Sequence, residues 1–275
     1  MTTIAYRFGI GMCTLFLFTA SCDDDDDTTP APTVVKEWNL NISAKNENPA
    51  PAGRTETGTV NLELLSDNSM TYAISVTGLA SGDVLNAAHL HAGDAITNGP
   101  IILDFAPVFT GGNASGTISN VRTSLVDSLD VNTNEIYFNA HSTQVGSGLV
   151  RAQLNTNVEM AADVSLTAAN EVPPGTSLAT GTALVRVTAD KFAYVQLTVT
   201  GVEANDTLTA AHIHKAGTGV NGPIILGFYA TEGDFGTIKK LPISDTLLNS
   251  LKADSIYVNA HSKRKPGGLI RGQIR

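Results

Sequence analysis

Short stretches of alternating apolar and polar residues run along most of the chain. They lie at residues 38–44, 60–64, 72–76, 164–168, 183–187 and 195–199. Alternation with a period of two directs apolar side chains to one face of a β-strand and polar side chains to the other. Turn-forming pairs such as Asn48-Pro49, Asp67-Asn68 and Gly111-Gly112 separate these stretches. The pattern therefore predicts many short strands, each with one face on a core.

Two short stretches depart from this alternation and favour a helix. Ser244-Asp245 provides a helix start, and three leucines follow it at helical spacing. The corresponding apolar positions earlier in the chain are Leu125, Val126 and Leu129. Seven or eight short strands with one short helix, repeated in each half of the chain, are typical of a Greek-key β-sandwich.

The chain contains the same set of sequence blocks twice. Residues 87–93, 98–103, 137–142 and 148–154 recur at 210–217, 221–226, 257–262 and 268–274. The second set lies 120 to 123 residues after the first, so only a small deletion separates the copies. We therefore expect two tandem domains of one fold, at residues 34–155 and 158–275, joined by almost no linker.

The composition excludes several classes of protein. Of 275 residues, 26 are acidic and 17 basic, which argues against nucleic acid as a partner because binding phosphates needs a basic face. Two cysteines cannot form a disulfide framework or an iron–sulfur site. The copies differ in charge, with 11 acidic and 5 basic residues at 34–155 but 10 and 11 from residue 158 onward. Either the surfaces of the two copies bind different partners, or the charge of their solvent-exposed faces has changed without functional consequence.

The first 21 residues have the pattern of a bacterial lipoprotein signal peptide. Arg7 precedes an apolar run at residues 8–20, which is too short to span a bilayer and is typical of a secretory signal. Thr19-Ala20-Ser21-Cys22 resembles the lipobox, although leucine is usual where Thr19 stands. We expect cleavage before Cys22 and lipidation at Cys22. An ordinary signal peptide followed by a chance cysteine is the alternative.

Residues 22–33 follow as an acidic, Thr/Pro-rich tether. Five aspartates occupy residues 23–27, and their mutual repulsion together with Pro30 and Pro32 favours an extended chain. An acidic run behind a lipidated cysteine resembles the surface-export signal of Bacteroidetes-type lipoproteins, whereas elsewhere an aspartate there can mean retention in the inner membrane. The expected location is the bacterial cell envelope, lipid-anchored at the outer membrane and exposed at the surface, with the membrane as the partner of the anchor.

All six histidines lie inside the repeated blocks. Each copy contains a His-x-His pair, whose imidazoles share one face of a strand, and one further histidine about 50 residues later. Three imidazoles can bind zinc or copper, and a three-histidine site with an open position is of the catalytic type. The candidate metal ligands are His89, His91 and His141 in the first copy and His212, His214 and His261 in the second.

Alternation also places a polar patch beside these histidines, on the sheet face that points away from the core. Its members are Tyr137, Asn139, Arg151 and Gln153 in the first copy and Tyr257, Asn259, Arg271 and Gln273 in the second. A structural interpretation competes with metal binding: the imidazoles bond to backbone and hold the connection after Gly93 or Gly217, and the arginines and glutamines bond within the patch or to a sheet edge. Asn46-Glu47 and Asn170-Glu171 either add a carboxylate or, as we favour, form a turn or edge.

These blocks together resemble the chordin-type (CHRD) domain. The resemblance rests on His-x-His followed by glycine, then Asn-Gly-Pro-Ile, Tyr-x-Asn-x-His-Ser and a closing Gly-Leu-x-Arg-x-Gln, with Asn-Glu-x-Pro near the start of each copy. It covers both copies and implies an extracellular β-sandwich module of secreted and bacterial surface proteins, with no established catalytic activity. Animal members are associated with binding growth factors, which does not transfer to a bacterial lipoprotein.

A fainter resemblance is to Cu,Zn superoxide dismutase, which also has a Greek-key β fold. There a His-x-His pair and a late histidine are copper ligands, as the three histidines of each copy would be. The bridging histidine, the zinc-loop residues and the disulfide are missing from this sequence, which argues against dismutase activity and leaves at most a copper- or zinc-binding vestige. The expected fold is two tandem sandwiches, immunoglobulin-like or superoxide-dismutase-like, each with one short helix.

Two hypotheses of function follow. In the first, which we favour, the chain is a lipid-anchored envelope protein whose domains bind an extracellular or periplasmic protein or glycan, and no catalytic residue is assigned. In the second, each domain holds copper or zinc at its three histidines, and redox or hydrolytic chemistry becomes available. The second hypothesis requires the three ligand nitrogens of a domain to converge to about 3–4 Å from one another.

Overall fold

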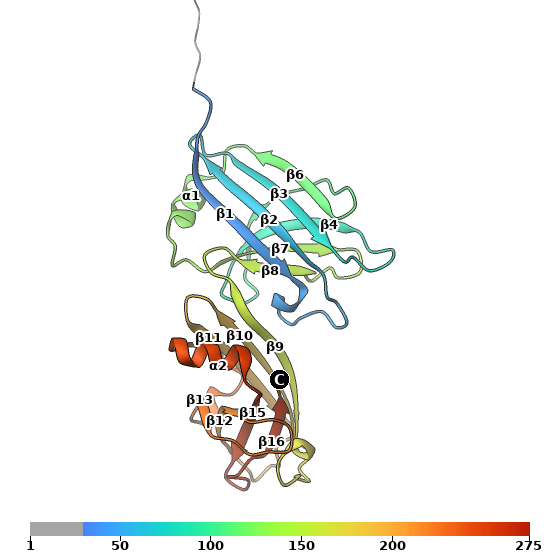
Figure 1. The fold of residues 1–275 in the computed structure, drawn as a ribbon, viewed down its shortest axis with the longest axis vertical. Helices are drawn as coiled ribbons and strands as arrows, with labels where there is room; N and C mark the ends of the chain where they lie inside the picture. The colour runs from blue at the N-terminus through green and yellow to red at the C-terminus, as the bar shows by residue number, and fades with distance from the viewer. Residues whose placement is uncertain (1–29) are drawn as a thin grey trace, which may run out of the picture. The chain divides into compact units, whose positions relative to one another are not determined.

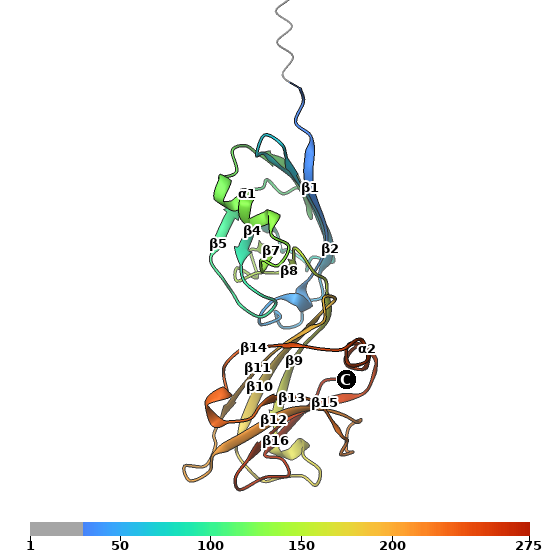
Figure 2. The ribbon, with the colours of Figure 1, turned by 90° about the vertical axis from the view of Figure 1, so that its left-hand side faces the viewer.

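The computed structural model describes residues 30–275, drawn as a ribbon in Figure 1 and, turned by 90°, in Figure 2. The expected signal peptide, Cys22 and the aspartates at 23–27 lie outside the described residues. Along 30–275, no helix combines the length and the apolar character that a bilayer crossing demands.

The first domain is an antiparallel β-sandwich of eight strands in the order β5-β4-β7-β8-β1-β2-β3-β6 (Figure 1). One residue pair, Ser43 opposite Arg151, joins β1 to β8 and so connects the two layers. The elements are β1 (Val34–Ser43), η1 (Ala44–Asn46), β2 (Thr57–Leu65), β3 (Met70–Thr77), β4 (Leu85–Ala92), β5 (Ile101–Asp104), β6 (Asn113–Ile118), α1 (Thr123–Asp130), β7 (Ile136–Ser142) and β8 (Val150–Gln153).

The second domain repeats this arrangement, with the strand order β13-β12-β15-β16-β9-β10-β11-β14. Arg271 opposite Thr167 is the pair that joins β16 to β9. The elements are β9 (Val158–Thr167), η2 (Ala168–Asn170), β10 (Thr180–Thr188), β11 (Phe192–Thr200), β12 (Leu208–Lys215), β13 (Ile224–Tyr229), η3 (Glu232–Asp234), β14 (Lys239–Pro242), α2 (Asp245–Ala253), β15 (Ile256–Ser262) and β16 (Ile270–Gln273).

The strand order is that of a Greek key. Strands β1, β2 and β3 are consecutive neighbours, and the last strand, β8, returns beside β1, so that the spatial order is 8-1-2-3. Figure 2 shows β1 and β2 on one side of the first domain and β4, β5, β7 and β8 on the other. These features confirm the predicted fold class of two tandem all-β sandwiches with one short helix each.

Alternating apolar residues of the two layers meet in the core of each domain. In the first domain, Leu40 and Ile42 of β1, Leu90 of β4 and Phe138 of β7 belong to one buried cluster, and the second domain has a corresponding cluster. Burying one such side chain contributes roughly 1.5–3 kcal/mol. The core therefore fixes which face of β4 and β7 remains for the histidines.

Both predicted helices are present, and their starts differ. The Ser244 hydroxyl accepts a hydrogen bond from the Leu247 N–H at the start of α2, whereas Arg122 precedes α1 without a side-chain cap. Leu251 of α2 and Leu125 and Leu129 of α1 are buried, so packing of the apolar face holds both helices.

The face of β7 and β8 that points away from the core is not a solvent-facing surface. Tyr137, Asn139, Arg151 and Gln153 are all buried, and Arg151 is only 1% exposed. The connection between β4 and β5 covers them, because Arg151 donates to the Thr97 carbonyl and Gln153 to the Gly93 carbonyl. Each domain therefore has a second, polar interior beneath this connection.

Candidate metal centres

The antiparallel register of β4 and β7 brings the three histidines of the first domain together. His89 lies opposite Asn139 and His91 opposite Tyr137, while His141 lies opposite Ala87, one step along the same face from His89. Side chains two residues apart share a face, so all three imidazoles project beneath the β4–β5 connection. Strands β12 and β15 place His212, His214 and His261 in the same register.

One ring nitrogen from each of the three histidines lies within 4.8 Å of the other two, in both domains. The closest pairs are His89 Nδ1 with His141 Nε2 at 3.0 Å and His212 Nδ1 with His261 Nε2 at 3.1 Å. Tetrahedral ligands bound at 2.0–2.1 Å stand about 3.3 Å apart. The widest pair, up to 4.8 Å apart, exceeds the expected separation of about 3–4 Å and would have to contract by about 1.5 Å, given those bond lengths, to complete the triangle.

Backbone carbonyls orient two of the three imidazoles in each site. His91 Nδ1 lies 2.9 Å from the Gly99 carbonyl, and His141 Nδ1 lies 3.0 Å from the Gly146 carbonyl. Because a carbonyl only accepts, each Nδ1 carries the proton and each Nε2 offers a lone pair. His214 with Gly222 and His261 with Pro266 repeat these contacts at 2.9 Å.

The Nε2 atoms of His91 and His214 are buried and have no hydrogen-bond partner among the described residues. Leaving a buried acceptor unsatisfied costs about 1–3 kcal/mol. This Nε2 atom is left unsatisfied in both domains, and it is one of the three nitrogens between which a metal ion would lie. The other two imidazoles share a hydrogen bond, in which His89 Nδ1 donates to His141 Nε2 and His212 Nδ1 to His261 Nε2. A transition-metal ion that took the place of this shared proton would bind all three imidazoles.

Four of the six histidines have a lowered pKa, which favours the neutral form that binds metals. Burial lowers the pKa of His89, and the neighbouring His141 lowers it further. Burial and the neighbouring His261 bring the pKa of His212 down to about 4. Burial also lowers the pKa of His91 and His261. Protons therefore compete weakly for these nitrogens at neutral pH.

The predicted patch residues form a stack against each site. The Tyr137 ring lies parallel to His91 at 4.8 Å, and the Arg151 guanidinium lies 3.4 Å from the centre of the Tyr137 ring. Tyr257, His214 and Arg271 repeat this stack with distances of 4.8 and 3.3 Å. The arginines also hold the connection above the site, so the structural interpretation of the patch and the metal-site geometry apply together.

The Asn-Gly-Pro block closes the connection onto the site. A side chain at Gly99 would clash with the Ala92 carbonyl, since its Cβ would stand 1.5 Å from that oxygen, and Gly222 meets Lys215 in the same way. The Gly99 N–H donates to the Tyr137 hydroxyl at 3.2 Å. Glycine is therefore required at this turn so that its carbonyl can reach the histidine.

Glu47 and Glu171 are buried carboxyl groups of these polar interiors, which corresponds to the less favoured of the two alternatives for them. Burial raises the pKa of Glu47 to about 7, against the opposing charge of Arg151 and a hydrogen bond from Asn139. Burial likewise raises the pKa of Glu171 to about 7. The expected turn is formed by their neighbours, because the Asn46 and Asn170 amides donate to the carbonyls of Arg151 and Arg271.

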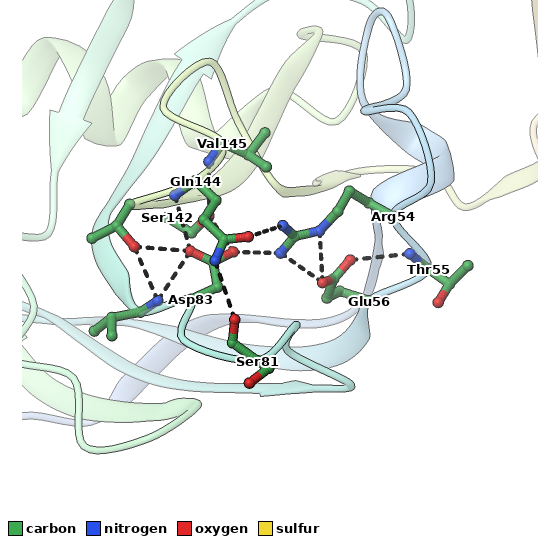
Figure 3. Close-up of polar contacts among 10 residues, drawn as sticks. Arg54, Thr55, Glu56, Ser81, Asp83, Ser142, Gln144 and Val145 are labelled. Atoms are coloured by element: carbon green, nitrogen blue, oxygen red, sulfur yellow. Dashed lines mark hydrogen bonds and ion pairs between the residues drawn. The ribbon is translucent and has the colours of Figure 1, made fainter.

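A network around Asp83 anchors the loop after β7 (Figure 3). Asp83 accepts hydrogen bonds from the Ser142 hydroxyl at 2.8 Å and the Gln144 N–H at 3.0 Å, and Arg54 pairs with the same carboxylate. Burial opposes the charge, but Arg54 and these donors hold the pKa of Asp83 well below its usual range. The anchored loop carries the Gly146 carbonyl that orients His141.

Comparison with known proteins identifies one family. The model of the CHRD domain matches residues 38–154 and again residues 162–274. No curated protein and no solved structure shows a significant match to the chain. The matched ranges contain all six histidines together with the patch residues of both sites.

Proposed function

The chain belongs to the CHRD domain family, and from the geometry of its histidines we propose that it is a metal-binding protein whose two domains each hold one copper or zinc ion. The observation that carries the proposal is the unsatisfied Nε2 of His91 and of His214, each facing two further imidazoles. A metal ion would satisfy that atom and draw the three nitrogens together.

The type of metal follows from the donor set. Three neutral imidazoles without a thiolate suit copper or zinc, whereas magnesium and calcium prefer oxygen ligands. Three protein ligands leave a fourth position for water or a small ligand, where a bound metal would supply Lewis-acid or redox chemistry. The surrounding residues orient the imidazoles, keep them neutral and limit access of water from the side of the connection.

Metal analysis of the full chain tests this proposal. We expect two zinc or copper ions per chain after equilibration and dialysis, one ion in either His91→Ala or His214→Ala, and none in the double variant. Asn41→Ala, on the exposed outer face of β1, is the control and keeps two ions. A natively folded protein without stoichiometric metal, or a double variant that retains it, contradicts the proposal.

We further propose that the protein is lipid-anchored at the bacterial cell envelope, at the outer membrane and exposed at the surface. The lipobox-like Thr19-Ala20-Ser21-Cys22, the apolar run before it and the aspartates after it support this location. Cys22→Ala should move the protein from the membrane fraction to the soluble fraction, while Cys13→Ala, inside the expected signal peptide, should leave it membrane-bound. Unchanged fractionation of Cys22→Ala would show that the anchor is not there.

A second candidate function, binding of a glycan, is favoured by a groove of about 780 Å³ on the first domain. Uncharged amide and hydroxyl side chains line it, which suits the hydroxyl groups of a neutral sugar. Its polar lining comprises Asn39, Asn41, Thr59, Asn61, Ser75, Thr110, Asn113 and Ser115. Retention on immobilised neutral polysaccharide, lost in Asn41→Ala and kept in His91→Ala, supports this function, and equal elution of all three proteins contradicts it.

A further inference from the structure

The two sites share their ligands but differ at one position on the neighbouring edge strand. In the first domain, β5 pairs with β4 so that Asp104 lies opposite His89. In the second domain, β13 pairs with β12 so that Gly227 lies opposite the equivalent His212. A carboxylate thus stands beside one site, and no side chain stands in its place beside the other.

The carboxylate of Asp104 faces the ring nitrogen of His89 that points away from the metal triangle. His89 Nδ1 points to His141 Nε2 at 3.0 Å, and His89 Nε2 lies 3.6 Å from Asp104 Oδ1. This separation is long for a hydrogen bond and within range of an ion pair. Asp104 Oδ1 also accepts the Ala106 N–H at 2.8 Å, so the carboxylate is held in position.

A carboxylate at this place favours metal binding at the opposite nitrogen. It stabilises the tautomer with the proton on Nε2, which leaves Nδ1 free as a ligand, and it stabilises the positive charge that a bound metal draws onto the ring. Loss of such a partner typically costs 10- to 100-fold in metal affinity. Because the Asp104 side chain is 60% exposed, solvent screens its charge and we expect the lower end of that range.

The second site lacks this support, and its surroundings differ in charge. Because His261 Nδ1 donates to the Pro266 carbonyl, its Nε2 offers a lone pair, and Asn259 Oδ1, an acceptor 3.0 Å away, does not compete for it. Basic residues also follow the histidines of the second site in the sequence: Lys215 follows His214, and residues 263–265 follow His261, where the first domain has Ala92 and residues 143–145 without charge. Lys215 pairs with Asp254 and Arg264 with Glu203, so Lys263 and Lys265 carry the remaining positive charge. Positive charge near a site disfavours a bound cation.

We propose that Asp104 is a positioning residue that makes the first site the tighter of two unequal divalent-metal sites, so that the sites fill in order, the first domain before the second. This inference rests on the proposed metal-binding function. The second domain has room for an aspartate at Gly227, because a Cβ there would meet only His212 Cδ2, at 3.5 Å. The carboxylate can therefore be introduced beside the second site as well as removed from the first.

The test measures zinc affinity of each site in the full chain, by competition with a chromophoric chelator. His214→Ala leaves only the first site and His91→Ala only the second, and we expect zinc to bind the first at least about tenfold more tightly. Asp104→Asn in the His214→Ala chain should weaken binding about tenfold, and Gly227→Asp in the His91→Ala chain should strengthen it by a similar factor. Both effects should shrink in 1 M salt, which a purely structural role of Asp104 would not explain.

The outcomes separate the two claims. If neither single-site chain binds stoichiometric zinc while both remain folded, the proposed function fails. If both bind zinc with equal affinity, or if Asp104→Asn and Gly227→Asp each change the affinity less than twofold, the ordering by Asp104 is wrong and the metal sites themselves stand. Unchanged unfolding midpoints of the metal-free Asp104→Asn and Gly227→Asp chains exclude misfolding as the cause.

Discussion

The two domains have the same buried contacts around their histidines but differ in the residues on the neighbouring edge strand. The arginine–tyrosine–histidine stack, the carbonyl contacts to Nδ1 and the buried glutamate recur within about 0.1 Å in most paired distances. Asp104 and Gly227, by contrast, occupy the same edge-strand position, where the first provides a carboxylate and the second has no side chain. The arrangement of the imidazoles therefore depends on the interior beneath the connection, whereas the proposed difference in metal affinity depends on residues at the rim of each site.

A related difference concerns the anchored loops after β7 and β15. Both Asp83 and Asp206 accept a serine hydroxyl, from Ser142 or Ser262, and a backbone N–H of the anchored loop. Asp83 also pairs with Arg54 of the β1–β2 connection, whereas the guanidinium of Arg264 pairs with Glu203 and not with Asp206. The carboxylate is therefore the constant part of the anchor, and an ion pair accompanies it only in the first domain, among the described residues.

Removing a stacked arginine should have the largest effect and should stay within its own domain. Arg151→Met leaves carbonyls of the covering connection without donors, and we expect a loss of roughly 3–5 kcal/mol in the free energy of unfolding, with one of two metal ions lost. Arg271→Met should do the same for the other ion. Urea denaturation and metal analysis measure both effects, with the exposed Lys45→Met as control. If either variant releases both ions, the domains do not hold their metals independently.

The buried glutamates should give both domains the same dependence on pH. Their pKa is raised from 4.5 to about 7, so the fold favours the neutral carboxyl: the stabilisation is complete below pH 4.5 and is lost as the pH rises through 7. Glu47→Gln keeps the group neutral and should stabilise the protein at pH 8 by up to about 3 kcal/mol relative to its effect at pH 4.5.

Glu171→Gln should show the same sign with a smaller magnitude, since Glu171 is slightly more exposed than Glu47. Urea denaturation at a series of pH values measures the effect, and the exposed Glu232→Gln serves as control. A Glu47→Gln chain whose stability follows that of the parent at every pH would show that folding does not raise the pKa of Glu47.

The helix starts should give the smallest effect, with opposite signs in the two domains. Ser244→Ala removes the cap of α2 and should cost about 1 kcal/mol, whereas Arg122→Ser supplies a cap that α1 lacks and should stabilise by roughly 0.5–1 kcal/mol. Thermal unfolding measures both, and Ser244→Thr, which retains a capping hydroxyl, should stay near the parent. Equal destabilisation by Arg122→Ser would mean that the start of α1 is held by contacts other than a cap.

The strands, the two copies and the histidine faces could be predicted from the sequence because each depends on local periodicity or on repetition. His89 and His91 share a face through the strand period alone, and the repeat indicated that His141 belongs with them. The sequence offers attachment of the connection after Gly93 as one of two interpretations of the histidines, but the burial of Arg151 beneath that connection depends on how the connection folds. The same holds for Glu47, for which the sequence favours a turn or edge over a buried carboxylate. The pairing of Asp104 with His89 depends on where the next strand begins after the connection, which local periodicity does not determine.

The pairing of the first strand with the last strand also determines the order in which the molecule can be assembled. Ser43 of β1 meets Arg151 of β8, so the first sandwich cannot close until almost its whole length is available, but it then needs no strand of the second domain. Loop closure over more than 100 residues makes this a slow, non-local step. During synthesis from the N-terminus, the first domain can therefore bring its three histidines together while the second domain is still unfolded.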